Sequence, residues 1–234
     1  MISNIKYSIL LPGAFFDNRW PRKIDMIIEK FNCNTIYFFD HTINPINTDY
    51  PIYKQFEAIQ EVLDYRKDIR LGTLVTNLSR SSGDDICLSL SSIMSATNCF
   101  DFGIGVGDGK YEKNTTTNNF NIDQSIELIL NSFDFDNKSF SIFIGGTSEY
   151  VNSIAVRYDL GLNIWNKDQE YITKRFQEIG IKNKGRNSFT MPQDSLGVKV
   201  NTPSYCDEII FVIKDSSFDQ FIMQLDNIKG WIET

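Results

Sequence analysis

The sequence of 234 residues predicts an α/β protein, a compact (β/α)8 or TIM barrel in a single domain over residues 1–234. Short apolar runs typical of buried parallel strands alternate along the chain with stretches in which apolar residues recur at helical spacing. Signals of antiparallel hairpins, such as Asn-Gly between two alternating runs, do not interrupt this order. The count comes close to eight strand–helix units, which favours a closed barrel over an open doubly wound sheet, the alternative that the pattern leaves open. Eight units leave about 29 residues for each, so insertions must be short.

The first half of the chain contains three strand–helix units and a fourth strand. Ile24 and Ile27 recur at helical spacing behind Pro21, a residue typical of a first helical turn. Asp84 or Asp85 is expected to cap the third helix. In chain order we expect strands at 7–11, 35–39, 70–76 and 99–106, with helices at 22–31, 52–65 and 84–96 between them.

The second half continues the alternation. Glycines at positions 103, 105, 107 and 109 follow one another at the end of the fourth strand, which indicates close approach of backbone segments. The polar segment 110–121 predicts a loop. We expect helices at 122–133, 148–158, 168–179 and 218–232, and strands at 139–144, 162–165, 195–200 and 208–213, of which 195–200 is poorly defined.

Composition and charge exclude several classes of protein. The formal charge of −7 disfavours nucleic acid as a partner, because such a surface repels the phosphate backbone. Cys33, Cys87, Cys99 and Cys206 show neither C-x-x-C nor zinc spacing, so we expect reduced thiols of a cytoplasmic protein and no metal. No apolar window approaches the length of a membrane span, and the N-terminus lacks the pattern of a signal peptide. The expected partner is a small-molecule substrate.

Reactive groups of a (β/α)8 barrel follow the carboxyl ends of the strands, and Asp40 and His41 stand directly after the second one. His41 is the single histidine of the chain, and an unperturbed imidazole titrates near pH ~6.5, which suits proton transfer. Asp40 could orient the imidazole. The alternative is a histidine that only hydrogen-bonds a loop.

Other candidates follow the next three strands: Thr76 and Asn77, then Asp108 and Glu112, then Gly145, Gly146 and Thr147. The glycines precede a predicted helix, whose first N–H groups can bind phosphate oxygens; the alternative is a helix cap with glycines for close packing. Asp108 and Glu112 could act as general acids, although most acidic residues after a strand are simply solvated. Acyl transfer lacks support, since no G-x-S-x-G occurs.

Taken in order, these segments resemble the bacterial luciferase-like superfamily, whose members are (β/α)8 barrels that use FMN or the deazaflavin F420. The ordered set carries the resemblance, and no single motif does. Its parts are Tyr-Phe-Phe-Asp-His at 37–41, Arg-Leu-Gly-Thr-Leu-Val-Thr-Asn at 70–77, Gly-Ile-Gly-Val-Gly-Asp at 103–108, Phe-Ile-Gly-Gly-Thr at 143–147 and Arg-Tyr-Asp-Leu-Gly-Leu-Asn at 157–163.

The resemblance implies an F420-dependent oxidoreductase that transfers hydride to or from a small organic substrate. His41 would be the acid or base that faces the redox ring, Asp40 its partner, and Asp108 the counterpart of an acid in some F420 dehydrogenases. A non-proline cis peptide would join Leu74 and Val75 behind the ring. The implied cofactor-binding residues are Asp40, His41, Leu74, Val75, Thr76, Asn77, Gly107, Glu112, Gly145, Gly146 and Thr147, with the phosphate at Gly145 and Gly146.

The sequence departs from the family in three places and leaves alternatives open. Residues 42–45 lack the aromatic side chain of some F420 dehydrogenases, which argues against a sugar phosphate substrate. The loop at 78–83 is small and polar where the family usually has a basic loop with a proline, and the interval from Asp108 to Gly145 is shorter than usual. The alternatives are an FMN-dependent monooxygenase, a non-catalytic flavin-binding barrel and a cofactor-free interaction protein. A homodimer is also expected from the family, through helix faces rich in Ile and Phe.

Overall fold

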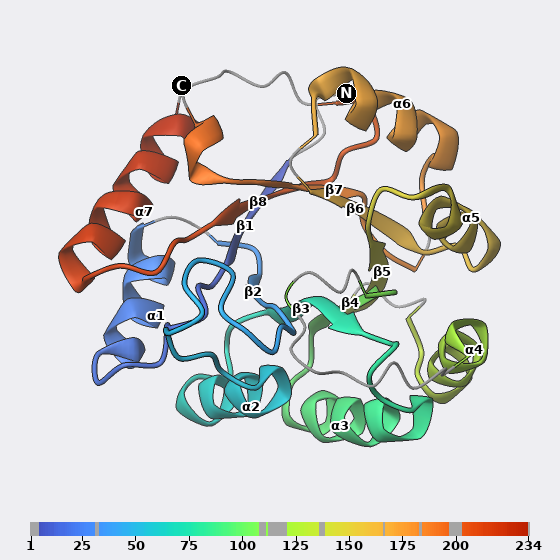
Figure 1. Cartoon of the computed structure of the whole chain (residues 1–234), viewed down its shortest axis with the longest axis horizontal. Helices are drawn as coiled ribbons and strands as arrows, with labels where there is room; N and C mark the ends of the chain where they lie inside the picture. The colour runs from blue at the N-terminus through green and yellow to red at the C-terminus, as the bar shows by residue number, and fades with distance from the viewer. Residues whose placement is uncertain are drawn as a thin grey trace.

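Eight parallel strands close into a barrel in chain order, with the helices arranged as an outer ring (Figure 1). The computed structural model describes residues 5–30, 33–107, 111, 121–135, 139–165, 167–182, 184–196 and 203–233. The strands are β1 (Lys6–Leu10), β2 (Ile36–Phe38), β3 (Leu71–Asn77), β4 (Phe100–Gly105), β5 (Phe140–Gly145), β6 (Gly161–Trp165), β7 (Ser188–Met191) and β8 (Glu208–Val212). The helices are α1 (Trp20–Lys30), α2 (Gln55–Tyr65), α3 (Gly83–Ala96), α4 (Ile122–Ser132), α5 (Glu149–Arg157), α6 (Gln169–Ile179) and α7 (Phe218–Ile232). The predicted (β/α)8 barrel is confirmed.

The seventh strand is the one element that the sequence misplaces. It runs over Ser188–Met191 and pairs with β6 and β8, whereas Ser195 of the expected strand 195–200 lies in a 3-10 helix, η1 (Gln193–Ser195). Positions 197–200 are outside the described residues. Phe189 and Met191 belong to the core between barrel and helices, so Ser188 and Thr190 face the barrel interior. Because the inner residues are polar, β7 lacks the continuous apolar run by which buried strands are recognised.

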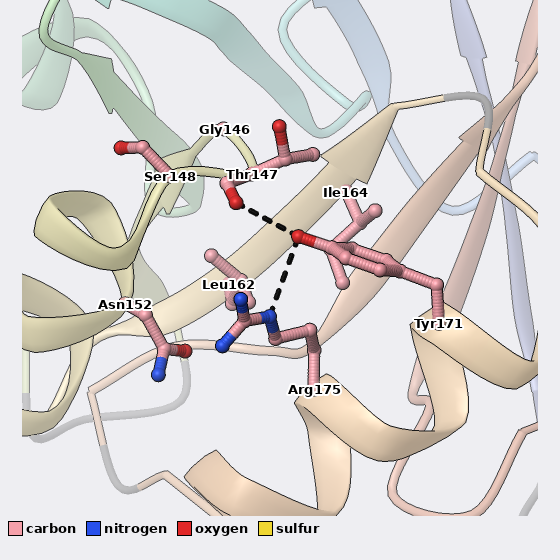
Figure 2. Close-up of a pocket in the computed structure, with 8 residues that line it drawn as sticks. All are labelled: Gly146, Thr147, Ser148, Asn152, Leu162, Ile164, Tyr171 and Arg175. Carbon is pink, nitrogen blue, oxygen red and sulfur yellow. Dashed lines mark hydrogen bonds between the residues drawn. The ribbon is translucent and has the colours of Figure 1, made fainter.

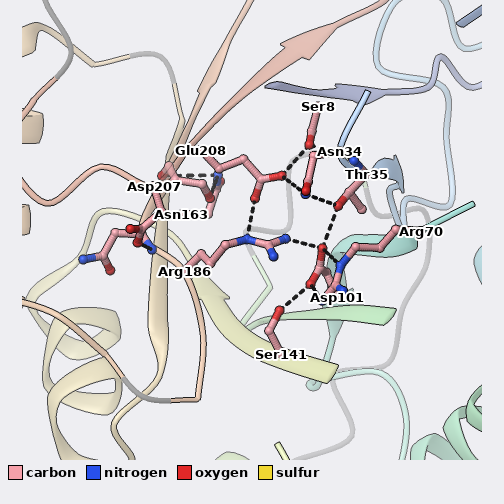
Figure 3. Close-up of polar contacts among 12 residues, drawn as sticks. Ser8, Asn34, Thr35, Arg70, Asp101, Ser141, Asn163, Arg186, Asp207 and Glu208 are labelled. Atoms are coloured by element: carbon pink, nitrogen blue, oxygen red, sulfur yellow. Dashed lines mark hydrogen bonds and ion pairs between the residues drawn. The ribbon is translucent and has the colours of Figure 1, made fainter. Parts of the chain in front are cut away.

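The amino-terminal end of the barrel is filled by a charged network centred on Asp101 of β4 (Figure 3). The fully buried Asp101 carboxylate accepts hydrogen bonds from Arg70 at 2.8 and 2.6 Å and from Thr35 at 2.7 Å, and it also contacts Arg186 and Ser141. Burial opposes ionisation, but the charge of Arg186 and then the hydrogen bond and charge of Arg70 hold the pKa of Asp101 well below its usual range.

Glu208 of β8 completes this network. Its carboxylate accepts from Tyr37 at 3.0 Å and from Arg186 at 3.3 Å, and Ser8 also donates to it. Two guanidinium groups therefore face two carboxylates, and the network is neutral in total. A cluster of ionised groups is tolerated at a buried position when its opposite charges balance in this way.

An apolar layer lies above the network and closes the barrel. It is formed by Leu10, Tyr37, Phe39, Leu74, Phe143 and Ile210, all of them buried. Gly72 and Gly103 make room for it, because a Cβ on either residue would collide with the rings of Tyr37 and Phe143 respectively. The absence of a side chain at Gly72 and Gly103 thus leaves space for the large rings of Tyr37 and Phe143 inside the barrel. The carboxyl-terminal mouth, where (β/α)8 barrels carry their sites, lies on the other side of this layer.

The third helix is capped by Ser82, not by Asp84 or Asp85 as the sequence suggested. The Ser82 hydroxyl accepts a hydrogen bond from the backbone N–H of Asp85 at 3.1 Å, and both aspartates lie within the first turn of α3. A hydroxyl placed just before the helix can satisfy an N–H that has no partner in the helix itself.

Ser82→Ala is therefore expected to lower the free energy of unfolding by about 1 kcal/mol, measured by urea titration. Ser91→Ala, an exposed site within the same helix, is the matched control and should leave stability unchanged or raise it slightly, since Ala is the better helix former. Equal losses in both variants would contradict the assignment of the cap.

No described helix is long and apolar enough to cross a membrane. The four cysteines are free, and burial raises the pKa of Cys206 to about 12. Because the thiolate is the nucleophilic form, Cys206 stays inert at neutral pH.

Candidate functional site

Asp40, just after β2, ties the ends of β2 and β3 together at the barrel mouth. Its carboxylate accepts the backbone N–H of Asn77 at 3.0 Å and forms an ion pair with Arg80, which also donates to the Asp40 carbonyl at 3.0 Å. The carboxylate is thus neutralised by Arg80, a residue that the sequence reasoning missed. That Asp40 orients His41 stays a prediction.

His41 lies half-buried among aromatic rings. Its imidazole packs against Phe39 at a centroid distance of 5.0 Å and against Tyr111 at 4.9 Å. Tyr111 is held in place by its carbonyl, which accepts from the N–H groups of Thr42 at 3.2 Å and Ile43 at 3.3 Å. Residues 42–45 contain no aromatic side chain, and Tyr111, from the segment after β4, is the aromatic neighbour of His41 instead. Since Tyr111 lies far from His41 in the sequence, no local pattern could have identified it.

The side chain of Val75, on β3, lies over the neighbouring strands β4 and β5 at the barrel mouth. The peptide bond between Leu74 and Val75 is cis, as the resemblance implied. A Cβ on Gly145 would lie 2.8 Å from a Val75 methyl group, and one on Gly105 would also overlap the Val75 side chain. These two glycines therefore let Val75 reach across β4 and β5, where it offers a branched apolar surface.

Thr76 and Asn77 are both buried but are engaged differently. The Thr76 hydroxyl donates to Gln55 of α2 at 2.7 Å, so any contact of Thr76 with a ligand in the mouth would come from its backbone. Asn77 accepts from the N–H and hydroxyl of Ser79 at 2.9 and 2.7 Å. Gly107 lies beside it with a φ of +81°, where a Cβ would meet Ser79 and Asn77. The ends of β3 and β4 thus meet in one polar corner.

The turn from β5 into α5 forms a small pocket open to solvent (Figure 2). Gly146 adopts a φ of +143° and donates its N–H to Asn163 at 3.0 Å, and Ser148 caps α5 by accepting from Val151 at 3.2 Å. Residues 147–150 are exposed at the positive end of the helix. The pocket is a small surface depression lined by Gly146, Thr147, Ser148, Asn152, Leu162, Ile164, Tyr171 and Arg175. Any group held here would bind at the surface, against the first N–H groups of α5.

The guanidinium of Arg175 in this pocket is paired with two acidic side chains. Arg175 reaches from α6 toward the turn, donates to Glu149 at 3.2 Å and pairs with Glu178 at 2.9 Å. The hydrogen bond that Arg175 donates to the Glu149 carboxylate is the main cause of the raised pKa of Arg175. Tyr171 donates to the Thr147 carbonyl at 2.8 Å and fixes the turn. Asn152 Oδ1 is buried, and within the described part of the chain no hydrogen-bond donor reaches it.

The structure thus places nine of the predicted residues around one barrel mouth: Asp40, His41, Leu74, Val75, Asn77, Gly107, Gly145, Gly146 and Thr147. Asp108 and Glu112 lie outside the described residues. Sequence reasoning missed Arg80 and Arg175. Arg80 had a usable signal, since it is the one cation between β3 and α3.

Comparisons with known proteins identify the fold. No family model matches the chain, and no curated protein matches it by sequence. Among solved structures, the apo form of MsnO8 and an F420-dependent secondary alcohol dehydrogenase in complex with an F420–acetone adduct each align with a TM-score of 0.69 at 9% identity. The monooxygenase RslO1 from Streptomyces bottropensis aligns with a TM-score of 0.65, also at 9% identity. Each alignment covers 98% of this chain and 99% of the other. At this identity the likeness establishes a shared barrel fold.

Proposed function

We propose that this chain is a luciferase-like oxidoreductase that uses F420 and transfers hydride to or from a small organic substrate in the barrel mouth. The observation that carries the proposal is the position of His41 in the segment that follows β2, where it packs against Phe39, a member of the apolar layer against which Val75 also packs. The fold shared with an F420-dependent alcohol dehydrogenase supports it.

The residues present fit a deazaflavin or flavin. Leu74 and Val75 offer an apolar surface of the kind that a flat ring system lies on, and Asn77 supplies polar groups at its edge. The exposed N–H groups of residues 147–150 and the guanidinium of Arg175 suit a phosphate, although Glu149 competes for Arg175. Asn152 Oδ1, an acceptor that no described donor reaches, is a further polar group beside this turn.

The protein's own contribution would be binding, orientation and one proton. When bound, F420 supplies or accepts the hydride. His41 gives a proton to the substrate oxygen or takes one from it, which typically accelerates such steps by ~10²–10⁴. Phe39 and Tyr111 hold the imidazole from two sides, and the Asp40–Arg80 pair keeps the net charge beside it near zero.

Two alternatives use the same mouth. An FMN-dependent monooxygenase is supported by the fold shared with RslO1. A non-catalytic flavin-binding barrel is supported by the short interval from Asp108 to Gly145, which leaves little chain to cover a substrate. Both share the flavin-type site and differ in the step after binding.

The proposal is tested by titrating the purified protein with F420 and with FMN and following each absorption spectrum. We expect saturable binding of F420 at micromolar concentration and weaker binding of FMN. Arg175→Gln should weaken F420 binding at least about tenfold, whereas Arg157→Gln, on the outer surface of α5, should not change it. Tighter binding of FMN would select the monooxygenase, and failure of both ligands to bind would refute the proposal.

A further inference from the structure

Trp165 is a large apolar side chain left exposed at the barrel mouth. It is the last residue of β6, and 44% of its surface is exposed. Leu162 and Ile164 face outward, since both belong to the core between barrel and helices. Because side chains alternate along a strand, Asn163 and Trp165 face the barrel interior.

The closed strand order places Trp165 opposite His41. Four strand positions separate β2 from β6 in either direction around the barrel, so the residues that end these strands lie across the mouth from each other. Eight strands about 4.8 Å apart and tilted about 36° form a ring about 15 Å across. Two long side chains that reach inward from opposite walls leave a gap suited to a flat group.

Trp165 differs from the other two tryptophans in its aromatic contacts. Trp20 lies 5.3 Å from the ring of Phe16 in a tilted arrangement, and Trp231 lies 5.4 Å from the ring of Phe211 edge to face. No described ring, cation or hydrogen-bond acceptor contacts Trp165. A half-exposed tryptophan at the mouth of a barrel indicates a binding surface, whereas single exposed leucines are common on protein surfaces and indicate nothing.

The polar groups near Trp165 are already satisfied. Asn163 donates to Ser188 and to Thr190, each at 3.0 Å, and all three residues are buried. Lys214, after β8, pairs with Asp194 at 2.8 Å. Among the described residues on these strands and after β8, these groups are thus already paired, which favours an uncharged ligand over an ionic one.

We propose that Trp165 is the platform on which the substrate stacks, and that the substrate carries a flat, uncharged conjugated ring such as an aromatic ketone or a quinone. The inference rests on the proposed function, because it takes the mouth between His41 and Trp165 as the reaction site. The ring lies on the indole face, and its carbonyl points across the mouth toward His41.

Equilibrium dialysis with menadione, a planar quinone, tests this inference. We expect Trp165→Leu to weaken menadione binding about tenfold, whereas Trp165→Phe keeps affinity within about threefold because it keeps a ring. Tyr65→Leu, which removes a ring of similar exposure on the outer face of α2, is the matched control and should bind as the wild type does. The saturated bicyclic 1-decalone should bind at least about tenfold more weakly than menadione.

A variant with Phe in place of Trp20 and Trp231 locates the site, since menadione should then quench the remaining Trp165 fluorescence saturably. Unchanged menadione affinity in Trp165→Leu, or an equal loss in Tyr65→Leu, would overturn the inference. The binding assay needs no cofactor, so it separates the two claims: loss of F420 and FMN binding refutes the proposed function, and menadione binding that ignores Trp165 refutes this one.

Discussion

Asp101→Asn is expected to lower the free energy of unfolding by about 3–5 kcal/mol, the usual cost of removing one partner from a buried ion pair. The substitution keeps the size of the side chain but removes the charge that Arg70 and Arg186 share. Glu208, with one contact to Arg186 at 3.3 Å, would be left to balance two partly buried cations. Urea titration of wild type and variant at neutral pH measures the loss.

Asp123→Asn is the matched control, because Asp123 pairs with Arg157 at 2.8 Å on the surface. The free energy of unfolding of Asp123→Asn should fall by less than about 1 kcal/mol. The pKa of Asp101 is depressed in the folded state, so its contribution is complete above the ordinary aspartate pKa of ~3.9 and is lost as pH falls below it. Wild type should therefore lose more stability than Asp101→Asn on acidification below about pH 4. Equal losses for Asp101→Asn and Asp123→Asn would show that the network is not the centre of stability at this end of the barrel.

His41→Ala is expected to reduce turnover by about 10²–10⁴-fold while the F420 dissociation constant changes by less than about threefold. The reason is that His41 is placed to move the proton that accompanies hydride transfer, whereas the cofactor is held mainly by the Val75 wall and the turn at Gly146. The assay follows oxidation of reduced F420 with menadione as acceptor.

Thr42→Ala is the control for this second prediction, since Thr42 is the exposed neighbour of His41 and should keep most of the activity. Turnover of His41→Ala within about threefold of wild type would remove His41 from the chemistry. A parallel loss of F420 binding would instead assign His41 to cofactor binding.

The barrel could be predicted because its outward-facing residues are apolar in nearly every strand. β2 and β8 show this as continuous runs, and Ile24 and Ile27 mark the helix between β1 and β2. β7 could not be found in the same way, because its inner residues Ser188 and Thr190 serve a polar cluster with Asn163. A strand of four alternating polar and apolar residues gives a weaker signal than a continuous apolar run.

The site was predictable where it depends on position after a strand and not where it depends on tertiary contact. Asp40, His41 and the glycines at 145 and 146 follow strand ends and could be read from the sequence. Tyr111 and Arg175 come from other segments, and only the closed barrel brings them to His41 and to the β5–α5 turn. The role of Gly105 was likewise hidden, since it makes room for Val75 on a neighbouring strand.

Hydrogen–deuterium exchange with and without saturating F420 tests most directly the claim that a flavin-type cofactor lies in the barrel mouth. With F420 bound, exchange should be slower at the carboxyl ends of β2 and β3 and in the turn at 145–151, and unchanged at the opposite, amino-terminal end of the barrel around Asp101. Protection confined to that amino-terminal end, or no protection anywhere at saturation, would contradict the claim.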